Sequence, residues 1–193
     1  VHEQNQGYDA LDTDVWDAID AAATKPSGCM PYFPGPGLGG HCIPIDPFYL
    51  TWKARDYGMS TRFIELAGEI NTRMPAHIVA RLRETLDRET GRGLRGAEIL
   101  LVGVAYKKNV SDMRESPAMR IMQLLDSAGA FVSYLDPHVQ EIPKMREYSK
   151  YANLASLNPE TVSTRQFSAV IVTTDHDDID YNGLLELDCP ILD

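Results

Sequence analysis

The chain has 193 residues, 44% hydrophobic and 24% charged, which is typical of a globular protein with one large or two small domains. Its formal net charge of −10 argues against a nucleic-acid partner, because phosphates repel an acidic surface. The sequence has no run of about eighteen apolar residues, so we also expect no membrane partner.

The three cysteines, Cys29, Cys42 and Cys189, are odd in number and their spacing fits no zinc pattern. Residues 1–6 lack the basic and apolar regions of a signal peptide. We therefore expect reduced thiols, a cytoplasmic location, and an N-terminus that is an interior segment of a longer chain.

In the first half, apolar residues at helical spacing predict a helix over 14–23, ended by residues 25–28. The stretch 31–47 is dense in proline and glycine, and we expect a loop there rather than a regular helix or a central strand. Helical patterns return over 48–54 and 63–86, the second long and amphipathic.

The second half has a different pattern, in which apolar strands alternate with helices. The predicted strands are 98–104, 131–135, 169–174 and 190–192, and the predicted helices are 116–129 and 181–187. This alternation predicts an α/β fold, with a helical unit over 1–92 followed by a doubly wound, Rossmann-like parallel sheet over 93–193. No element is assigned to 138–156.

The segment Gly35-Pro36-Gly37-Leu38-Gly39-Gly40 matches the dinucleotide-binding pattern G-x-G-x-x-G. That pattern binds a pyrophosphate only between a strand and a helix N-terminus, and prolines flank it here on both sides. We expect instead that a ligand or another segment of the chain packs closely against these glycines.

Cys42 follows two glycines, and Asp46 lies four residues later, close enough in a compact turn to act as an orienting group or base. Alternatively, Cys42 is a buried small hydrophobic residue, as many free cysteines are. A cysteine hydrolase or a metal site would need partner residues for which the spacing of His77, His138 and His176 gives no support.

Two long motifs carry a family resemblance. The segment 33–50, FPGPGLGGHCIPIDPFYL, resembles the active-site segment of the UDP-glucose/GDP-mannose dehydrogenase family, and 103–117, GVAYKKNVSDMRESP, is similar to the start of its C-terminal domain. The UDP-N-acetylhexosamine 6-dehydrogenases are the most similar members. UDP-glucose enzymes usually carry Ser and Lys where this chain has His41 and Ile45, but UDP-glucose stays an alternative substrate.

The resemblance implies an NAD-dependent oxidation of the sugar C6 from alcohol to carboxylate. Cys42 would trap the intermediate aldehyde as a thiohemiacetal, which is oxidised to a thioester, and Asp46 would help water to hydrolyse it. The resemblance also implies a homodimer formed through the helical segment, and a C-terminal domain that holds the UDP-sugar rather than NAD.

The chain itself offers several candidate substrate ligands. Lys107 and Arg114 are cationic groups between a predicted strand and helix, where ligands of open α/β sheets bind. An ion pair of Arg114 with Asp112 or Glu115 is an equal alternative. The expected substrate-binding residues are Tyr32, Phe33, Gly37, Gly39, Gly40, Lys107 and Arg114. For Tyr49 we expect core packing, and His41, Lys25 and Arg73 receive no role.

The family's NAD-binding domain and its catalytic lysine and asparagine have no counterpart in the sequence, and the last strand looks incomplete. We therefore expect a C-terminal part of an enzyme that is inactive alone. A non-catalytic nucleotide-binding or dimerisation module is the alternative from another class.

Overall fold

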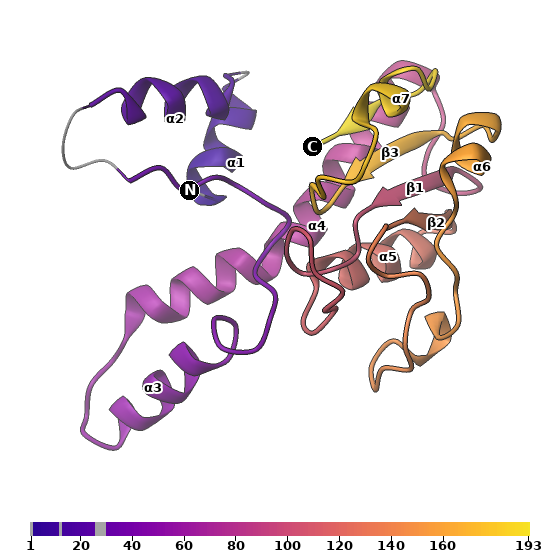
Figure 1. Ribbon diagram of the computed structural model, residues 1–193. Helices are drawn as coiled ribbons and strands as arrows, with labels where there is room; N and C mark the ends of the chain where they lie inside the picture. Colours follow the sequence, from indigo (N-terminus) through magenta and orange to yellow (C-terminus); the bar gives the residue numbers. More distant parts are fainter. Residues whose placement is uncertain (1, 12, 26–29) are drawn as a thin grey trace.

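The computed structural model describes residues 2–11, 13–25 and 30–193. Two short helices, α1 (His2–Ala10) and α2 (Val15–Ala23), form a hairpin at the N-terminus, with α1 packed against the long helix α4 (Figure 1). The carboxylate of Asp14 accepts a hydrogen bond from the Trp16 backbone N–H and caps α2, a helix that the apolar spacing predicted over 14–23. Residues 26–28, expected to end this helix, and Cys29 lie outside the described residues.

Helix α3 (Asp46–Arg55) and the first half of α4 (Arg62–Thr90) project from the rest of the molecule as an arm (Figure 1). We call residues 46–70 the helical arm. The expectation of a loop through residue 47 was wrong at its end, because α3 already begins at Asp46 with Pro47 in its first turn. A proline is compatible with that position, since the first amide of a helix has no intrahelical acceptor.

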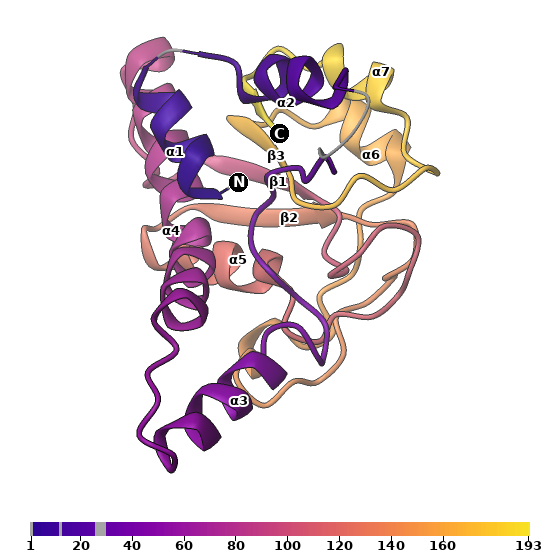
Figure 2. The same cartoon turned by 90° about the vertical axis from the view of Figure 1, so that its left-hand side faces the viewer.

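The C-terminal half contains a four-stranded parallel sheet in the order β2-β1-β3-β4, which confirms the predicted α/β class (Figure 2). Its elements are β1 (Glu98–Val102), α5 (Pro117–Ser127), β2 (Phe131–Leu135), the 3-10 helix Ser149–Tyr151, α6 (Pro159–Thr164), β3 (Ala169–Val172), α7 (Tyr181–Leu185) and β4 (Ile191–Leu192).

Helices cover both faces of the sheet. The C-terminal half of α4 and helix α5 pack on one face, where Leu82, Leu86 and Ile121 meet Ile99 and Leu101 of β1 in a fully buried core. Helices α6 and α7 cover the other face with a smaller cluster. Neighbouring residues of β1 thus point into opposite cores, which explains its unbroken apolar sequence.

Two strands are shorter than the sequence pattern predicted. Strand β1 ends at Val102 because Gly103 turns the backbone with a φ of 76°, and β3 ends at Val172. A side chain at Gly103 would lie 2.4 Å from the carbonyl oxygen of Thr174, so the two strand ends approach as closely as their backbones allow. Both loops therefore leave the sheet at the same edge.

Candidate functional site

A cavity lies at the carboxyl edge of the sheet, between the loops that follow β1 and β3. Its volume is 890 Å³, and we call it the switch-point pocket. The strand order reverses between β1 and β3, so this is where ligands of doubly wound folds bind. Its walls include Lys107 and Lys108 after β1, Thr173 and Thr174 after β3, and Trp16 and Phe33 from the N-terminal segment.

The rings of Trp16 and Phe33 stack with centroids 5.5 Å apart and planes inclined by 22°. Both rings are about half exposed and border the switch-point pocket. Phe33 was predicted from the motif around it, whereas Trp16 was missed because it reads as one more apolar residue of an amphipathic helix.

The glycine-rich loop packs tightly on the second motif, so the expected close approach is made by another segment of the same chain. A Cβ at Gly39 would lie 2.5 Å from the Cβ of Tyr106, and one at Gly40 would lie 2.9 Å from the Tyr106 ring. The backbone N–H of Gly40 donates to the carbonyl oxygen of Arg114 over 2.8 Å, and Gly37 faces Pro117. The two motifs, more than sixty residues apart, form one structural unit.

Cys42 is exposed in the turn between this loop and α3, which excludes the alternative of a buried hydrophobic residue. Its carbonyl oxygen accepts hydrogen bonds from the backbone N–H groups of Ile45, at 3.1 Å, and Asp46, at 2.8 Å. Cys42 is therefore joined by a hydrogen-bonded turn to the start of α3. Asp46 is exposed in the first turn of this helix, where the helix dipole favours a carboxylate.

Arg114 is paired with Asp112. Its Nε atom lies 3.0 and 2.9 Å from the two carboxylate oxygens, and Nη2 lies 2.6 Å from the second. This hydrogen bonding is the main cause that raises the pKa of Arg114, and the negative charges of Asp112, Tyr106 and Cys42 contribute further. Of the alternatives for Arg114, the structure shows the ion pair with Asp112.

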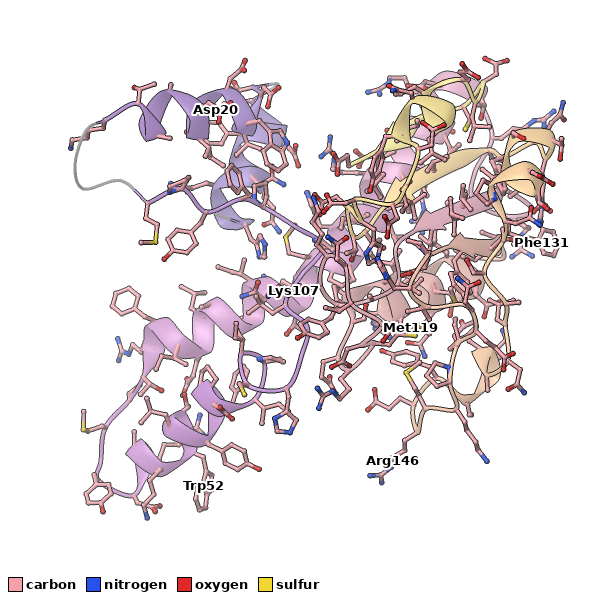
Figure 3. All side chains as sticks on the ribbon, viewed as in Figure 1. Asp20, Trp52, Lys107, Met119, Phe131 and Arg146 are labelled. Atoms are coloured by element: carbon pink, nitrogen blue, oxygen red, sulfur yellow. The ribbon has the colours of Figure 1, made fainter. Side chains whose placement is uncertain are left out.

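The neighbours Lys107 and Lys108 differ in their partners. The Nζ atom of Lys108 lies 3.4 Å from Asp175 Oδ2 and 2.7 Å from Asp177 Oδ1. The pKa of Lys108 is raised, mainly by its hydrogen bond with Asp177. Lys107 is exposed at the pocket wall and forms no ion pair within the described residues. Figure 3 shows Lys107 where the helical arm, the N-terminal hairpin and the sheet domain meet. Its charge is therefore available to an anion.

A second cavity, of 1010 Å³, lies between the helical arm and α5. We call it the arm pocket. Its lining includes Gly37, Gly40, His41 and Arg114, together with apolar side chains of both helices of the arm. Lys107 and Phe33 border the switch-point pocket instead, while Tyr32, Gly39, Cys42 and Asp46 line neither. The structure thus divides the predicted site residues between two pockets and the loop between them.

The comparisons with known proteins agree with this geometry. The central-domain model of the UDP-glucose/GDP-mannose dehydrogenase family matches residues 1–73, and its UDP-binding-domain model matches residues 100–188. The chain belongs to this family. Both motifs of the site, the glycine-rich loop with Cys42 and the loop with Lys107, lie within the matched segments.

Relatives of this chain act on nucleotide sugars, as their names say. The chain is similar to a UDP-N-acetyl-D-mannosamine dehydrogenase of Methanococcus maripaludis, with 36% identity over 88% of this chain and 35% of that protein. It is similar to an NDP-N-acetyl-D-galactosaminuronic acid dehydrogenase of Ralstonia nicotianae, with 30% identity over 91% of this chain and 38% of that protein.

Among solved structures, the chain resembles a UDP-D-ManNAc dehydrogenase from Pyrococcus horikoshii. The TM-score is 0.77 at 26% identity, over 99% of this chain and 42% of that chain. The chain thus spans less than half the length of these members of the UDP-glucose/GDP-mannose dehydrogenase family.

Enzymes of the UDP-glucose/GDP-mannose dehydrogenase family depend on NAD, but the loop 35–40 lacks the surroundings of a dinucleotide-binding fingerprint. The loop 35–40 follows an irregular segment instead of a strand, and α3 begins only at Asp46. Its glycines also pack on Tyr106, which fills the space that a pyrophosphate would need. The expectation that this loop is no NAD fingerprint agrees with both observations.

Within residues 2–11, 13–25 and 30–193, no helix is long and apolar enough to cross a lipid bilayer. No group of three histidine, cysteine or carboxylate side chains there could hold a metal ion.

Proposed function

We propose that this chain is part of an NAD-dependent UDP-N-acetylhexosamine 6-dehydrogenase, in which Cys42 is the covalent nucleophile. The observation that carries the proposal is the packing of Gly39 and Gly40 on Tyr106, the residue next to Lys107. Cys42 follows Gly40 by two residues, which span at most about 7 Å. A diphosphate bound by Lys107 therefore has its sugar within reach of the Cys42 loop.

We assign the nucleotide to the switch-point pocket. Its volume of 890 Å³ is within the range of small-molecule sites, and its rim carries the free ammonium group of Lys107. Phe33 adds an exposed aromatic face to this pocket. The other predicted substrate contacts lie outside it, with Gly37, Gly40 and Arg114 in the arm pocket and Tyr32 and Gly39 in neither pocket. The N-acetylated substrate class follows the names of the relatives and the presence of His41 and Ile45 in place of the serine and lysine of UDP-glucose enzymes.

The chemistry of this chain centres on one thiol. NAD, the oxidant of the family, would supply the oxidation by accepting the two hydrides that leave C6. The Cys42 sulfur adds to the carbon of the intermediate aldehyde, and the carbonyl oxygen takes a proton to form a thiohemiacetal. After oxidation to the thioester, water attacks the same carbon, the C–S bond breaks, and the carboxylate and the thiol are released. Asp46 orients that water.

Cys42 is suited to this role by its exposure, which leaves the sulfur accessible to a substrate carbonyl. Cys189 offers a contrast within the same chain, because burial raises the pKa of its thiol. The unpaired state of both thiols also agrees with the cytoplasmic location that belongs to this proposal.

We further propose that the protein forms a homodimer through the helical arm. The arm carries the large exposed apolar side chains Phe48, Tyr49, Leu50, Trp52, Tyr57, Met59, Phe63 and Leu66. Tyr49 is 68% exposed, so the expected core packing of this residue was wrong. Figure 3 shows Trp52 on the outer side of the arm, far from Phe131 at the opposite end of the molecule. An apolar surface of this extent is typical of an interface.

Calorimetric titration of the 193-residue chain with UDP tests the nucleotide part of the proposal. We expect measurable binding, a loss of about tenfold or more in Lys107→Gln, and a smaller loss in the matched variant Lys108→Gln, whose ammonium already has two carboxylate partners. Equal affinity of wild type and Lys107→Gln would exclude this site. Binding of UDP without oxidation by the full-length gene product would favour the non-catalytic module.

A further inference from the structure

Asp136, the residue directly after β2, is a buried carboxylate with five hydrogen-bond donors. Its Oδ2 accepts from the backbone N–H groups of Val104, at 2.7 Å, and Ala105, at 3.1 Å, and its Oδ1 accepts from those of His138 and Val139, at 2.8 and 2.9 Å. Its exposed fraction is 1%. Four backbone donors already satisfy this charge, so a fifth is not needed to keep it buried.

The fifth donor is the imidazole of His176, which is completely buried beside it. His176 Nε2 lies 3.2 Å from Asp136 Oδ2, and its Nδ1 lies 2.9 Å from the backbone nitrogen of Asn109. A carboxylate can only accept and a backbone N–H can only donate. Nε2 therefore carries the proton, and Nδ1 is an acceptor for Asn109.

Asn109 lies two residues after Lys107 and adopts a left-handed backbone conformation with a φ of 58°. Its side chain and Asp177 exchange two hydrogen bonds, of 2.6 and 3.0 Å. The hydroxyl of Thr174 donates to the Ala105 carbonyl oxygen over 2.7 Å. The loop that carries Lys107 is thus attached to the loop after β3 on both sides of the lysine.

We propose that His176 is a positioning residue for the diphosphate site, acting through the Asn109 backbone to hold the Lys107 loop in the conformation that binds the ligand. This inference rests on the proposed function, since it needs Lys107 to bind a diphosphate. The acceptor at Nδ1 is the essential feature, because the Asp136 charge is satisfied without His176. An imidazole satisfies both neighbours at once, which no apolar side chain of similar size can do.

Two substitutions separate the two contacts. In His176→Asn the amide oxygen occupies the place of Nδ1, so the acceptor for Asn109 is kept and the donor to Asp136 is lost. In His176→Gln the amide nitrogen reaches the place of Nε2, so the donor to Asp136 is kept and the acceptor for Asn109 is lost. Each variant removes one hydrogen bond from the same buried site, and its melting temperature measures what that bond contributes to stability.

The test is calorimetric titration of the wild-type chain and both variants with UDP, together with hydrogen exchange of the Asn109 amide without ligand. We expect UDP affinity within about twofold of wild type for His176→Asn, and a loss of about fivefold to tenfold for His176→Gln. The Asn109 amide should be protected in the first variant and exchange rapidly in the second.

Equal UDP affinity in the two folded variants, or losses that follow their melting temperatures, would overturn the positioning role and leave the proposed function intact. An absence of UDP binding by the wild-type chain would instead contradict the nucleotide site itself. In that case a difference in hydrogen exchange of the Asn109 amide would show only that His176 stabilises the loop structure. The positioning role would then be refuted together with the nucleotide site.

Discussion

A methyl group added at Gly39 should separate the glycine-rich loop from the sheet domain. The new Cβ would lie 2.5 Å from the Tyr106 Cβ and 3.1 Å from the carbonyl oxygen of Glu115. Non-bonded carbon atoms normally stay about 3.5–4.0 Å apart, so the loop must withdraw by about 1 Å. A rotamer change cannot relieve the contact, because both obstructing atoms belong to the backbone or are bonded directly to it.

Overpacking of this kind costs about 1–3 kcal/mol, and for a chain of this size about 2 kcal/mol lowers the melting temperature by roughly 4–8 °C. The hydrogen bond from Gly40 to the Arg114 carbonyl, at 2.8 Å, lengthens in the same movement. Cys42 then moves away from the Lys107 loop, so turnover by the full-length gene product should fall together with stability.

Differential scanning calorimetry of Gly39→Ala and Gly35→Ala measures the effect. Gly35 belongs to the same loop, and a Cβ there meets no atom within 4 Å, so Gly35→Ala is the matched control. We expect it to melt within about 1 °C of wild type. If both variants melt together, the packing of this loop on Tyr106 is not what holds the two motifs in place.

Three further outcomes are expected. Leu82→Ala, in the fully buried contact of α4 with the sheet domain, should cost about 3 kcal/mol of unfolding free energy in calorimetry, and a cost below about 1 kcal/mol would contradict that packing. NMR titration should find the pKa of Asp112 below its ordinary value of 3.8, chiefly because it accepts hydrogen bonds from Arg114, and Arg114→Gln should raise it. Folding lowers the pKa of Asp112, so the stability that the Asp112–Arg114 pair contributes is fully present above the unfolded pKa of about 3.9. It is lost as the pH falls through the folded pKa. An unchanged Asp112 pKa in Arg114→Gln would refute hydrogen bonding by Arg114 as the cause. Phe63→Glu should shift the dimer to monomer in sedimentation analysis, whereas Phe131→Glu, at the opposite end of the molecule, should not; equal behaviour would exclude the arm as the interface.

The sheet domain was the part most accessible from sequence. Strand β2 has the predicted bounds of 131–135, because Asp136-Pro137 ends it, and Ser116 caps α5 with its hydroxyl at the predicted start of that helix. Strand β1 was predicted two residues too long, since an apolar pattern does not reveal that Gly103 turns the chain. Helices α1 and α6 were missed, because they are short and largely polar.

The site was predictable as two motifs but not as one arrangement. Local chemistry left the burial of Cys42 and the partner of Arg114 open, and the structure shows an exposed thiol and an ion pair with Asp112. The role of Tyr106 as the surface on which the glycines pack depends on a contact between distant segments, and no local pattern contains it. The buried contact of His176 with Asp136 is of the same kind, since the two residues are forty positions apart.

The central claim is that Cys42 holds the sugar covalently between two oxidations. The most direct test is the ratio of NADH formed to uronate formed, with UDP-N-acetyl-D-mannosamine as substrate, in the full-length gene product and its Cys42→Ser variant. We expect two NADH per uronate for the wild type and a rate lower by about a thousandfold for the variant. Two NADH per uronate at the wild-type rate in Cys42→Ser would contradict the account.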